Sequence, residues 1–562
     1  MLTRLSRGNI SRFCGLRCPR CLSNSSFSIY EYPTRTEAPE VTTTTAAEAR
    51  SLNPRRVPSP KLVPNSDADP FDDLCALTDE QILEIKKKQN EQLISIPVNS
   101  LPITSAVPYF IPPNVPSKEL EAPQTHITVL DNGVRVVSQE TYGQMCTVGI
   151  LTNVGSRHEA EVGTVHLLET LAFSSTTDYP DGIVINELLQ DWGATRFVSH
   201  SREQTLYCVD VLRPNIQKAV HLLSQVVLEP LLLEAEIESC KAILEFQAQE
   251  QPPELVLGEA LQVAAYGEDQ QLGRRHFANS QSIPHLSQTV VRDFFQANIR
   301  HNPKGMVLAG AGIGHDELVQ LADSYFGEIS QLSAPKTLPS EYRGGSFTIG
   351  PNHQALPVVG LQDECCRVAL AFPVGGWHSE AMVTACVLQT LLGGGSSFSA
   401  GGPGKGMYSR MYQHVLNRYG WMETAEAFTS FADEGGLFGV SASTPTPQKV
   451  QELVTILADQ LARLAIQPVS DLELSRARNM LKCNVLTQLE SRLILFEDMG
   501  RQVLTYGKRE DSATTCRKIE SVSADDIQRL AQDMLRQPPT LAATGNHLEQ
   551  VPTYQEVKRW FQ

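Results

Sequence analysis

The sequence has no uninterrupted run of about 18 or more apolar residues, the length that a membrane-spanning helix requires. It has no disulfide framework either, because its 12 cysteines show no paired spacing of that kind. Basic charge is scarce, since 47 Lys and Arg face 63 Asp and Glu, a formal net charge of -16. These absences predict no spanning helix, a reducing or neutral compartment, and no nucleic-acid partner.

Acidic residues are missing from residues 1–30, which carry Arg4, Arg7, Arg12, Arg17 and Arg20 and are rich in Ser. A basic, Ser-containing, acid-free start is typical of a mitochondrial transit peptide. The rival interpretation is a basic tail that binds nucleic acid, but no other basic cluster supports it. The composition therefore predicts a mitochondrial protein.

Residues 31–124 lack a sustained hydrophobic period and are interrupted by many prolines. They are predicted to be a Pro-rich extension of low order, apart from one helical stretch at 78–92. A hairpin then opens the folded region, with strands at 127–130 and 134–137. Asn132-Gly133 between them favours a two-residue turn.

Beyond the hairpin the chain repeats weakly, with a period of about 230 residues. Helical patterns beginning at Lys218 and Lys449 are each followed by a long helix, at 234–250 and 471–490. Each half closes with an apolar strand that ends at a glycine, Gly310 or Gly545. The repeat predicts an α/β (α+β) fold of two homologous domains, 125–345 and 350–562, each with a mixed sheet packed against helices. Residues 331–352 are the predicted linker.

Most, but not all, of a metal-binding motif lies on the predicted helix at 164–173. His166 and Glu169 fit H-x-x-E-H, in which two histidines one helical turn apart bind Zn²⁺ and the Glu acts as general base. The second histidine is replaced by Thr170, whose hydroxyl is a poor ligand. Read without further context, His166 is more often a satisfied core or surface histidine than a ligand.

The surrounding segments resemble the metallopeptidase family of pitrilysin and the mitochondrial processing peptidase. The similar segments are 155–159, 164–176 and 201–205, followed by the acidic helix that begins at Glu234. In that register the family's third ligand, a Glu, falls on Gln247, and a second acidic position falls on Cys240. Glu245 cannot substitute, because two residues rotate the side chain by about 200° around a helix. The resemblance implies a degenerate site of His166, Glu169, Thr170 and Gln247 that holds no metal, and no catalytic residue on this chain.

A glycine-rich segment is the second strong signal. It does not fit a Walker A loop, since Lys405 precedes Gly406 rather than Ser or Thr. It resembles the substrate-binding glycine-rich loop of the family's α-subunits. The resemblance implies that substrate contacts Gly393, Gly394, Gly395, Ser396, Ser397, Phe398, Ser399, Ala400, Gly401, Gly402, Pro403, Gly404, Lys405 and Gly406. A purely structural turn between helices is the alternative.

The resemblance as a whole implies a subunit that is inactive alone and recognises presequences. Its expected partners are a zinc-bearing β-subunit in a heterodimer and basic presequence peptides, together with the inner membrane by association. No cofactor is expected on this chain, and zinc is expected on the β-subunit. Two other functions stay open, a core subunit of the respiratory cytochrome reductase and an autonomous zinc peptidase.

Overall fold

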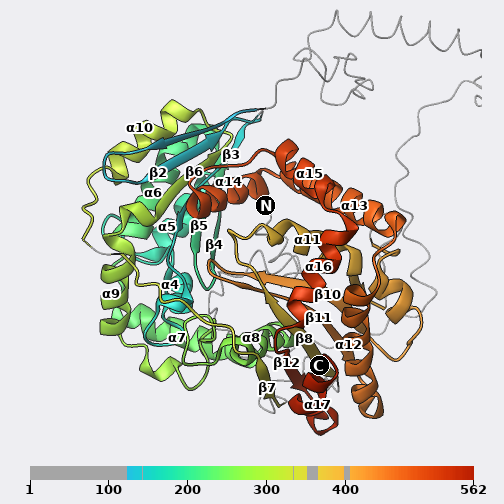
Figure 1. The fold of residues 1–562 in the computed structure, drawn as a ribbon. Helices are drawn as coiled ribbons and strands as arrows, with labels where there is room; N and C mark the ends of the chain where they lie inside the picture. The colour runs from blue at the N-terminus through green and yellow to red at the C-terminus, as the bar shows by residue number, and fades with distance from the viewer. Residues whose placement is uncertain (1–122, 142, 333, 351–364, 398–405) are drawn as a thin grey trace, which may run out of the picture. The chain divides into compact units, whose positions relative to one another are not determined.

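The computed structural model describes residues 123–141, 143–332, 334–350, 365–397 and 406–562 (Figure 1). The predicted transit peptide and the helix at 78–92 lie outside these residues, as does almost all of the 31–124 extension. No helix in the described part of the chain is both long and apolar enough to cross a membrane.

The first half contains a six-stranded mixed sheet in the order β1-β2-β6-β3-β5-β4. Only β2 and β6 pair in parallel, and the other neighbours are antiparallel. The strands are β1 (Thr125–Val129), β2 (Arg135–Gln139), β3 (Met145–Thr152), β4 (Thr195–His200), β5 (Thr205–Leu212) and β6 (Met306–Ala311).

The predicted hairpin is confirmed as β1 and β2, and residues 131–133, which lie between the two predicted strands, form its turn. Val129 pairs with Arg135, and the amide of Leu130 donates to the carbonyl of Val134 at 2.9 Å. Gly133 adopts φ 96°, a left-handed conformation that glycine tolerates without strain. Three residues therefore form the turn, which is the next most common hairpin loop.

Seven α-helices belong to the first half, and they include the predicted long helix near residue 234. Helix α6 packs on β3 and β5 and fills one face of the sheet with apolar side chains. The helices are α4 (Thr164–Leu171), α5 (Gly182–Asp191), α6 (Ile216–Leu228), α7 (Glu234–Gln249), α8 (Pro253–Tyr266), α9 (Gln288–Phe295) and α10 (His315–Phe326).

The second half repeats this topology, which confirms the predicted pair of homologous domains. Its sheet has the order β7-β12-β8-β11-β10-β9, in which β7 and β12 are the parallel pair. The strands are β7 (Gly345–Ile349), β8 (Cys366–Val374), β9 (Gly394–Ser396), β10 (Thr424–Phe431), β11 (Gly436–Thr444) and β12 (Thr540–Gly545). The first five strands of that order correspond to β2-β6-β3-β5-β4.

In the described residues of the second half, seven further α-helices accompany this sheet, and they include the predicted long helix near residue 471. They are α11 (Ala381–Leu392), α12 (Val450–Ile466), α13 (Asp471–Leu489), α14 (Arg492–Tyr506), α15 (Ser512–Ser521), α16 (Ala524–Leu535) and α17 (Tyr554–Arg559).

The predicted linker needs one correction, because residues 345–349 form strand β7 rather than a connection. Phe347 and Ile349 are β-formers, and the strand is stabilised by its parallel pairing with β12, nearly two hundred residues later. The second sheet therefore begins before residue 350.

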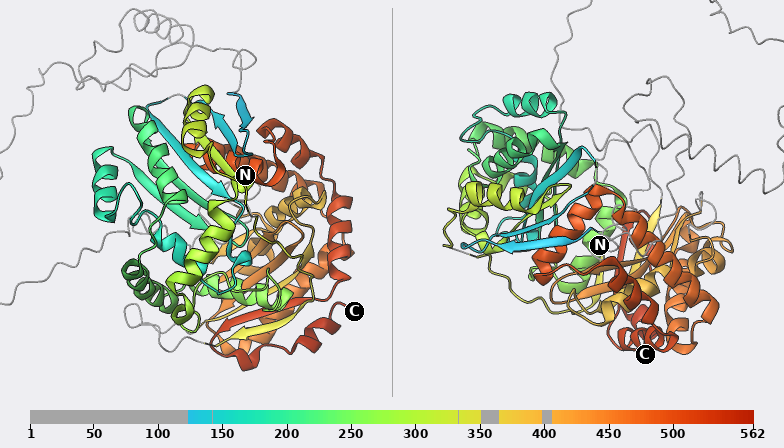
Figure 2. Two further views of the ribbon diagram at one scale, coloured as in Figure 1. Left: turned by 90° about the vertical axis from the view of Figure 1, so that its left-hand side faces the viewer. Right: turned by 90° about the horizontal axis from the view of Figure 1, so that it is seen from above.

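The two halves exchange one helix each. Helix α14 of the second half lies against β6, β3 and β2 of the first sheet, and α8 of the first half lies against β12, β7 and β8 (Figures 1 and 2). Leu495, Phe496, Met499 and Val503 of α14 are buried in this contact. A Cβ on Gly500 would lie 2.3 Å from Leu151 Cδ1, so only glycine permits so close an approach. Each sheet thus has one face covered by the other half.

Candidate functional site

The helix that carries the motif, α4, begins on a buried acid. The Glu159 carboxylate accepts hydrogen bonds from the amides of Gly163 and Val165, at 2.9 and 2.8 Å. An anion at a helix N-terminus satisfies amides that have no partner within the helix. Burial nevertheless raises the pKa of Glu159 to about 7. Glu159 therefore fixes the start of α4 at a cost in desolvation.

His166 lies on the buried side of α4 and is held by neighbours that are not metal ions. Its Nδ1 accepts a hydrogen bond from the amide of Ala278 at 3.3 Å, and the side chain of Gln247 on α7 is a second partner. Burial lowers the pKa of His166 to about 4, so the ring is neutral at physiological pH. The structure thus brings His166 and Gln247 together, as the register predicts.

Thr170 is directed to the backbone of its own helix. Its Oγ1 donates to the carbonyl of His166 at 3.0 Å, the usual bond of a threonine to the preceding turn. Glu245, excluded on helical rotation, is exposed on α7, whereas Cys240 is buried and burial raises its thiol pKa to about 11. None of these groups supplies a second or third ligand beside His166.

The residue that sequence reasoning missed is His200, the last residue of β4. Its side chain is 1% exposed and forms an ion pair through Nδ1 with Oε2 of Glu169. Its Nε2 lies 3.2 Å from the carbonyl oxygen of His276. Burial alone would lower the pKa of His200, but Glu169 and the His276 carbonyl raise it above its ordinary value. The same pair lowers the pKa of Glu169, although burial acts in the opposite direction.

Aromatic rings surround this ion pair. The ring centroids of His200 and His166 are 5.5 Å apart, and those of His200 and His276 are 4.2 Å apart. Phe277 contacts all three histidines edge-on. The site is therefore a compact cluster of histidines around one carboxylate.

The residues of this cluster do not fit zinc, which takes three protein ligands and a water in a catalytic site. His166 Nδ1 accepts from an amide, His200 uses both nitrogens, and Thr170 is bonded to backbone. Within the described ranges, no group of three or more His, Cys, Asp and Glu could hold a metal ion. The degenerate motif is therefore a hydrogen-bonded site rather than an open coordination site.

Two segments that carried the family resemblance meet at the boundary between the halves. Arg157 is buried and donates through Nη1 to Glu203 at 2.6 Å and to Glu434 of the second half at 2.8 Å. Its Nη2 donates to Glu434 at 2.5 Å and to the carbonyl of Leu338 at 3.0 Å. Arg157, in the segment 155–159, thus links the two halves through Glu203, Glu434 and the carbonyl of Leu338.

The glycine-rich segment starts inside the second sheet. After α11 ends, Gly393 adopts φ 56°, and β9 pairs antiparallel with the first residues of β10. A Cβ on Gly394, whose φ is 104°, would lie 2.0 Å from the carbonyl oxygen of Ala425. Residues 398–405, which include Phe398 and Lys405, lie outside the described residues. The first glycines therefore allow a close edge strand to form.

The segment returns to the fold beside α13. Met407 and Tyr408 are 40% and 63% exposed, and the Arg476 guanidinium lies 5.0 Å from the centroid of the Tyr408 ring. Arg410 Nε lies 2.9 Å from Oε1 of Glu473, and this partner helps to lower the pKa of Glu473 to about 2 although burial opposes the shift. Residues Met411–Leu416 then form a short π-helix. Both ends of the glycine-rich segment are thus anchored.

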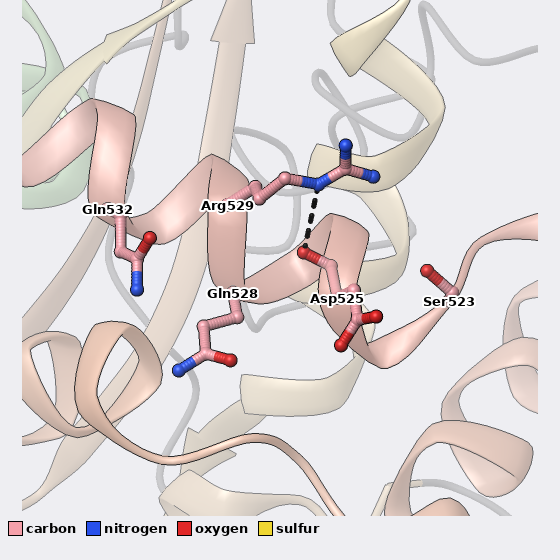
Figure 3. A pocket seen from close by; sticks show the side chains of 5 residues that line it. All are labelled: Ser523, Asp525, Gln528, Arg529 and Gln532. Carbon is pink, nitrogen blue, oxygen red and sulfur yellow. Dashed lines mark hydrogen bonds between the residues drawn. The ribbon is translucent and has the colours of Figure 1, made fainter.

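A surface pocket lies on α16, and its lining residues differ from those of the degenerate site and the glycine-rich segment. It is lined by Ser523, Asp525, Gln528, Arg529 and Gln532, and Arg529 Nε donates to the carbonyl of Asp525 at 3.4 Å (Figure 3). A cavity of about 640 Å³ lies between α11, α14, α15 and α16 and includes Trp377 and Tyr506. Neither contains a residue of the degenerate site or of the glycine-rich segment.

Comparison with known proteins relates both halves to one peptidase family. Residues 135–278 match "Insulinase (Peptidase family M16)", and residues 285–481 match "Peptidase M16 inactive domain". The chain is 35% identical over 452 residues to "Mitochondrial-processing peptidase subunit alpha" of Pongo abelii, covering 77% of this chain and 84% of that protein. It is 32% identical to the protein of the same name from Solanum tuberosum, covering 83% and 89%.

A solved structure has the same fold. A chain of "Complex III2 from Candida albicans, Inz-5 bound" superimposes with a TM-score of 0.65 at 18% identity, covering 78% of this chain and 99% of that chain. At this identity the likeness concerns the fold alone.

Proposed function

The chain belongs to peptidase family M16, and from this premise we propose that it is the non-catalytic α-subunit of a mitochondrial processing peptidase. In this role it pairs with a β-subunit that carries zinc on an intact H-x-x-E-H motif. It binds the basic presequences of imported precursors in the mitochondrial matrix and presents them for cleavage.

One observation carries the proposal: the metal-binding positions are lost while the glycine-rich segment is anchored at both ends. His166 and Glu169 are committed to Gln247, Ala278 and His200 rather than to a metal ion. The glycine-rich segment leaves the sheet at β9 and rejoins the fold at Ser409, whose Oγ accepts from the amide of Gly394 at 3.2 Å. The zinc motif is incomplete, whereas the residues on both sides of the glycine-rich segment are held in the fold. This combination suits substrate recognition rather than catalysis of peptide cleavage.

The acidic composition supports a basic substrate. A formal net charge of -16 attracts cationic peptides and speeds their encounter with the chain. Flexible presequences lose conformational entropy on binding, and the contacts that hold them must offset that cost.

Reconstitution with a β-subunit tests the proposal. We expect an equimolar mixture of the two chains to cleave a fluorogenic presequence peptide. We expect neither chain to cleave it alone. His166→Ala on this chain is the matched control and should leave cleavage by the mixture unchanged. Cleavage by this chain alone would identify an autonomous peptidase. Purification from mitochondria inside a membrane-embedded, quinol-oxidising complex would identify a reductase core subunit.

The glycine-rich segment is tested by removing only residues 398–405, because Gly394–Ser396 are part of the sheet. We expect presequence binding to weaken by about tenfold or more, with little change in melting temperature. Fluorescence binding of a labelled presequence, with thermal melts of both proteins, provides the measurement. Unchanged binding would make the segment a structural connector, and loss of assembly with the β-subunit would place it in the interface.

Import is tested at the N-terminus. We expect residues 1 to about 30 to be absent from the protein isolated from mitochondria, because an acid-free basic leader is removed after import. N-terminal sequencing of that protein decides the question, and an intact Met1 would contradict a cleaved transit peptide.

A further inference from the structure

The ion pair between His200 and Glu169 has an unusual hydrogen-bond arrangement. Two partners of the His200 ring, the carboxylate of Glu169 and the carbonyl oxygen of His276, are hydrogen-bond acceptors. A neutral imidazole has only one N–H and would leave one of these acceptors facing a lone pair. An imidazolium donates to both acceptors, so the geometry favours the protonated form of His200.

The place of this cation in the fold is specific. Glu169 is the position of the general base in H-x-x-E-H, which works beside a zinc ion in the active relatives of the motif. Here the positive charge beside that carboxylate comes from β4, and it lies next to the neutral ring of His166. Phe277 and His276 cover the rings from the segment that also holds Ala278.

We infer that the His200 side chain is a built-in cation that takes the place of a metal ion in this chain. It neutralises Glu169, links α4 to β4 and to the carbonyl of His276, and fills the space beside His166 with a ring. Two features then oppose zinc binding. Thr170 and Gln247 stand at positions where the motif has ligands, and the His200 ring is itself an obstacle to zinc. The pair would be present whichever protein the chain assembles with, so its test is independent of the proposed subunit role.

Restoring the missing ligands separates these causes. The variant Thr170→His/Gln247→Glu supplies the histidine and the carboxylate that the family motif calls for, and His200→Ala can be added to it. We expect the two-residue variant to bind little zinc and the three-residue variant to bind about one zinc per chain, measured by elemental analysis after dialysis. His285→Ala, which removes an exposed histidine, replaces His200→Ala in the matched control and should not raise zinc uptake.

Full zinc uptake by the two-residue variant would overturn the inference, because His200 would then be no obstacle. Failure of the three-residue variant to take up zinc would also count against it, since removal of His200 should open the site.

A double-mutant cycle on the natural chain tests the structural role without any metal. We expect Glu169→Gln and His200→Gln each to lower the melting temperature by roughly 5 °C, because each leaves the other member of a pair with a buried imidazole and a partly exposed carboxylate without its partner. The double variant should lose less than the sum of the two shifts. Additive shifts would show that the two side chains do not act as a pair and would overturn the inference.

Discussion

At the scale of single residues, the fold depends on a few buried charges. Glu159, His200 and Arg157 are all almost fully buried, and each has specific polar partners. Burying a charge is costly unless it is paired and hydrogen-bonded, so these positions respond strongly to substitution and to pH.

Glu159 gives a pH dependence of defined sign. Its pKa is about 7 in the folded chain, whereas the reference value is 4.5. Between pH 4.5 and 7 the folded chain therefore keeps a proton on Glu159 that the unfolded chain has lost. Stability contributed by this group therefore falls by about 3 kcal/mol as the pH rises from 4.5 to 7. We expect the difference in unfolding free energy between the natural chain and Glu159→Gln to change by that amount across this window. Urea unfolding at several pH values measures it, and the exposed Glu161→Gln is the control.

Arg157 joins the halves, and its removal should be costly. Arg157→Met leaves the carboxylates of Glu203 and Glu434 facing each other without a cation, which we expect to cost about 3–5 kcal/mol. Arg463→Met breaks an exposed pair with Asp459 and should cost less than about 1 kcal/mol. Denaturant unfolding of both variants measures the difference, and equal costs would contradict an anchoring role for Arg157.

Sequence reasoning located Glu169 and His166 but not His200. The motif is local, with its members on one helix, and so it is visible in the sequence. His200 lies 31 residues after Glu169 on a different element, and an isolated histidine at a strand end carries no pattern that predicts its partner. The replacement of two ligand positions by Thr170 and Gln247 can thus be read from the sequence, whereas the pairing of His200 with Glu169 cannot.

At the scale of elements, the glycine-rich segment combines a sheet edge with a loop. Gly394 must adopt φ 104° within van der Waals distance of β10. We expect Gly394→Ala to destabilise the chain by about 2–3 kcal/mol, because the new Cβ would collide with the backbone of Ala425. Gly420→Ala, where a Cβ meets nothing within 4 Å, should be close to neutral. Urea midpoints of the two variants provide the comparison, and equal midpoints would contradict a requirement for glycine in β9.

Elements with strong periodicity were predictable, and elements that depend on distant partners were not. Helices α7 and α13 match their predicted ranges to within a residue, because their apolar positions and acidic N-termini are local signals. Strand β7 was assigned to the linker because five residues among glycines and prolines carry little signal. Its pairing with β12 is decided by tertiary structure alone.

At the scale of the whole molecule, the exchange of α8 and α14 makes each half incomplete. Apolar side chains of α14 cover one face of the first sheet, and those of α8 cover one face of the second. An isolated half would expose an apolar sheet face and lose the helix that covers it, so the halves should not separate easily.

A protease site inserted between Ala334 and Pro335, in an exposed connection, tests this expectation. We expect the cleaved halves to co-elute in size-exclusion chromatography at micromolar concentration and to separate only in denaturant. Uncleaved chain carrying the same insertion is the control. Separate elution of the two fragments without denaturant would show that the exchanged helices contribute little to cohesion.

The exchange also bears on how such a chain could arise. Two identical copies of one half, related by a two-fold axis, would each lend the same helix to the other and close into a symmetric dimer. Joining the copies end to end by gene duplication keeps that contact and removes the need for the copies to stay identical. One copy could then keep a degenerate metal motif at α4 while the other acquired a glycine-rich segment at the corresponding place after α11. The helix exchange thus allows the two halves to diverge in function while they stay packed together.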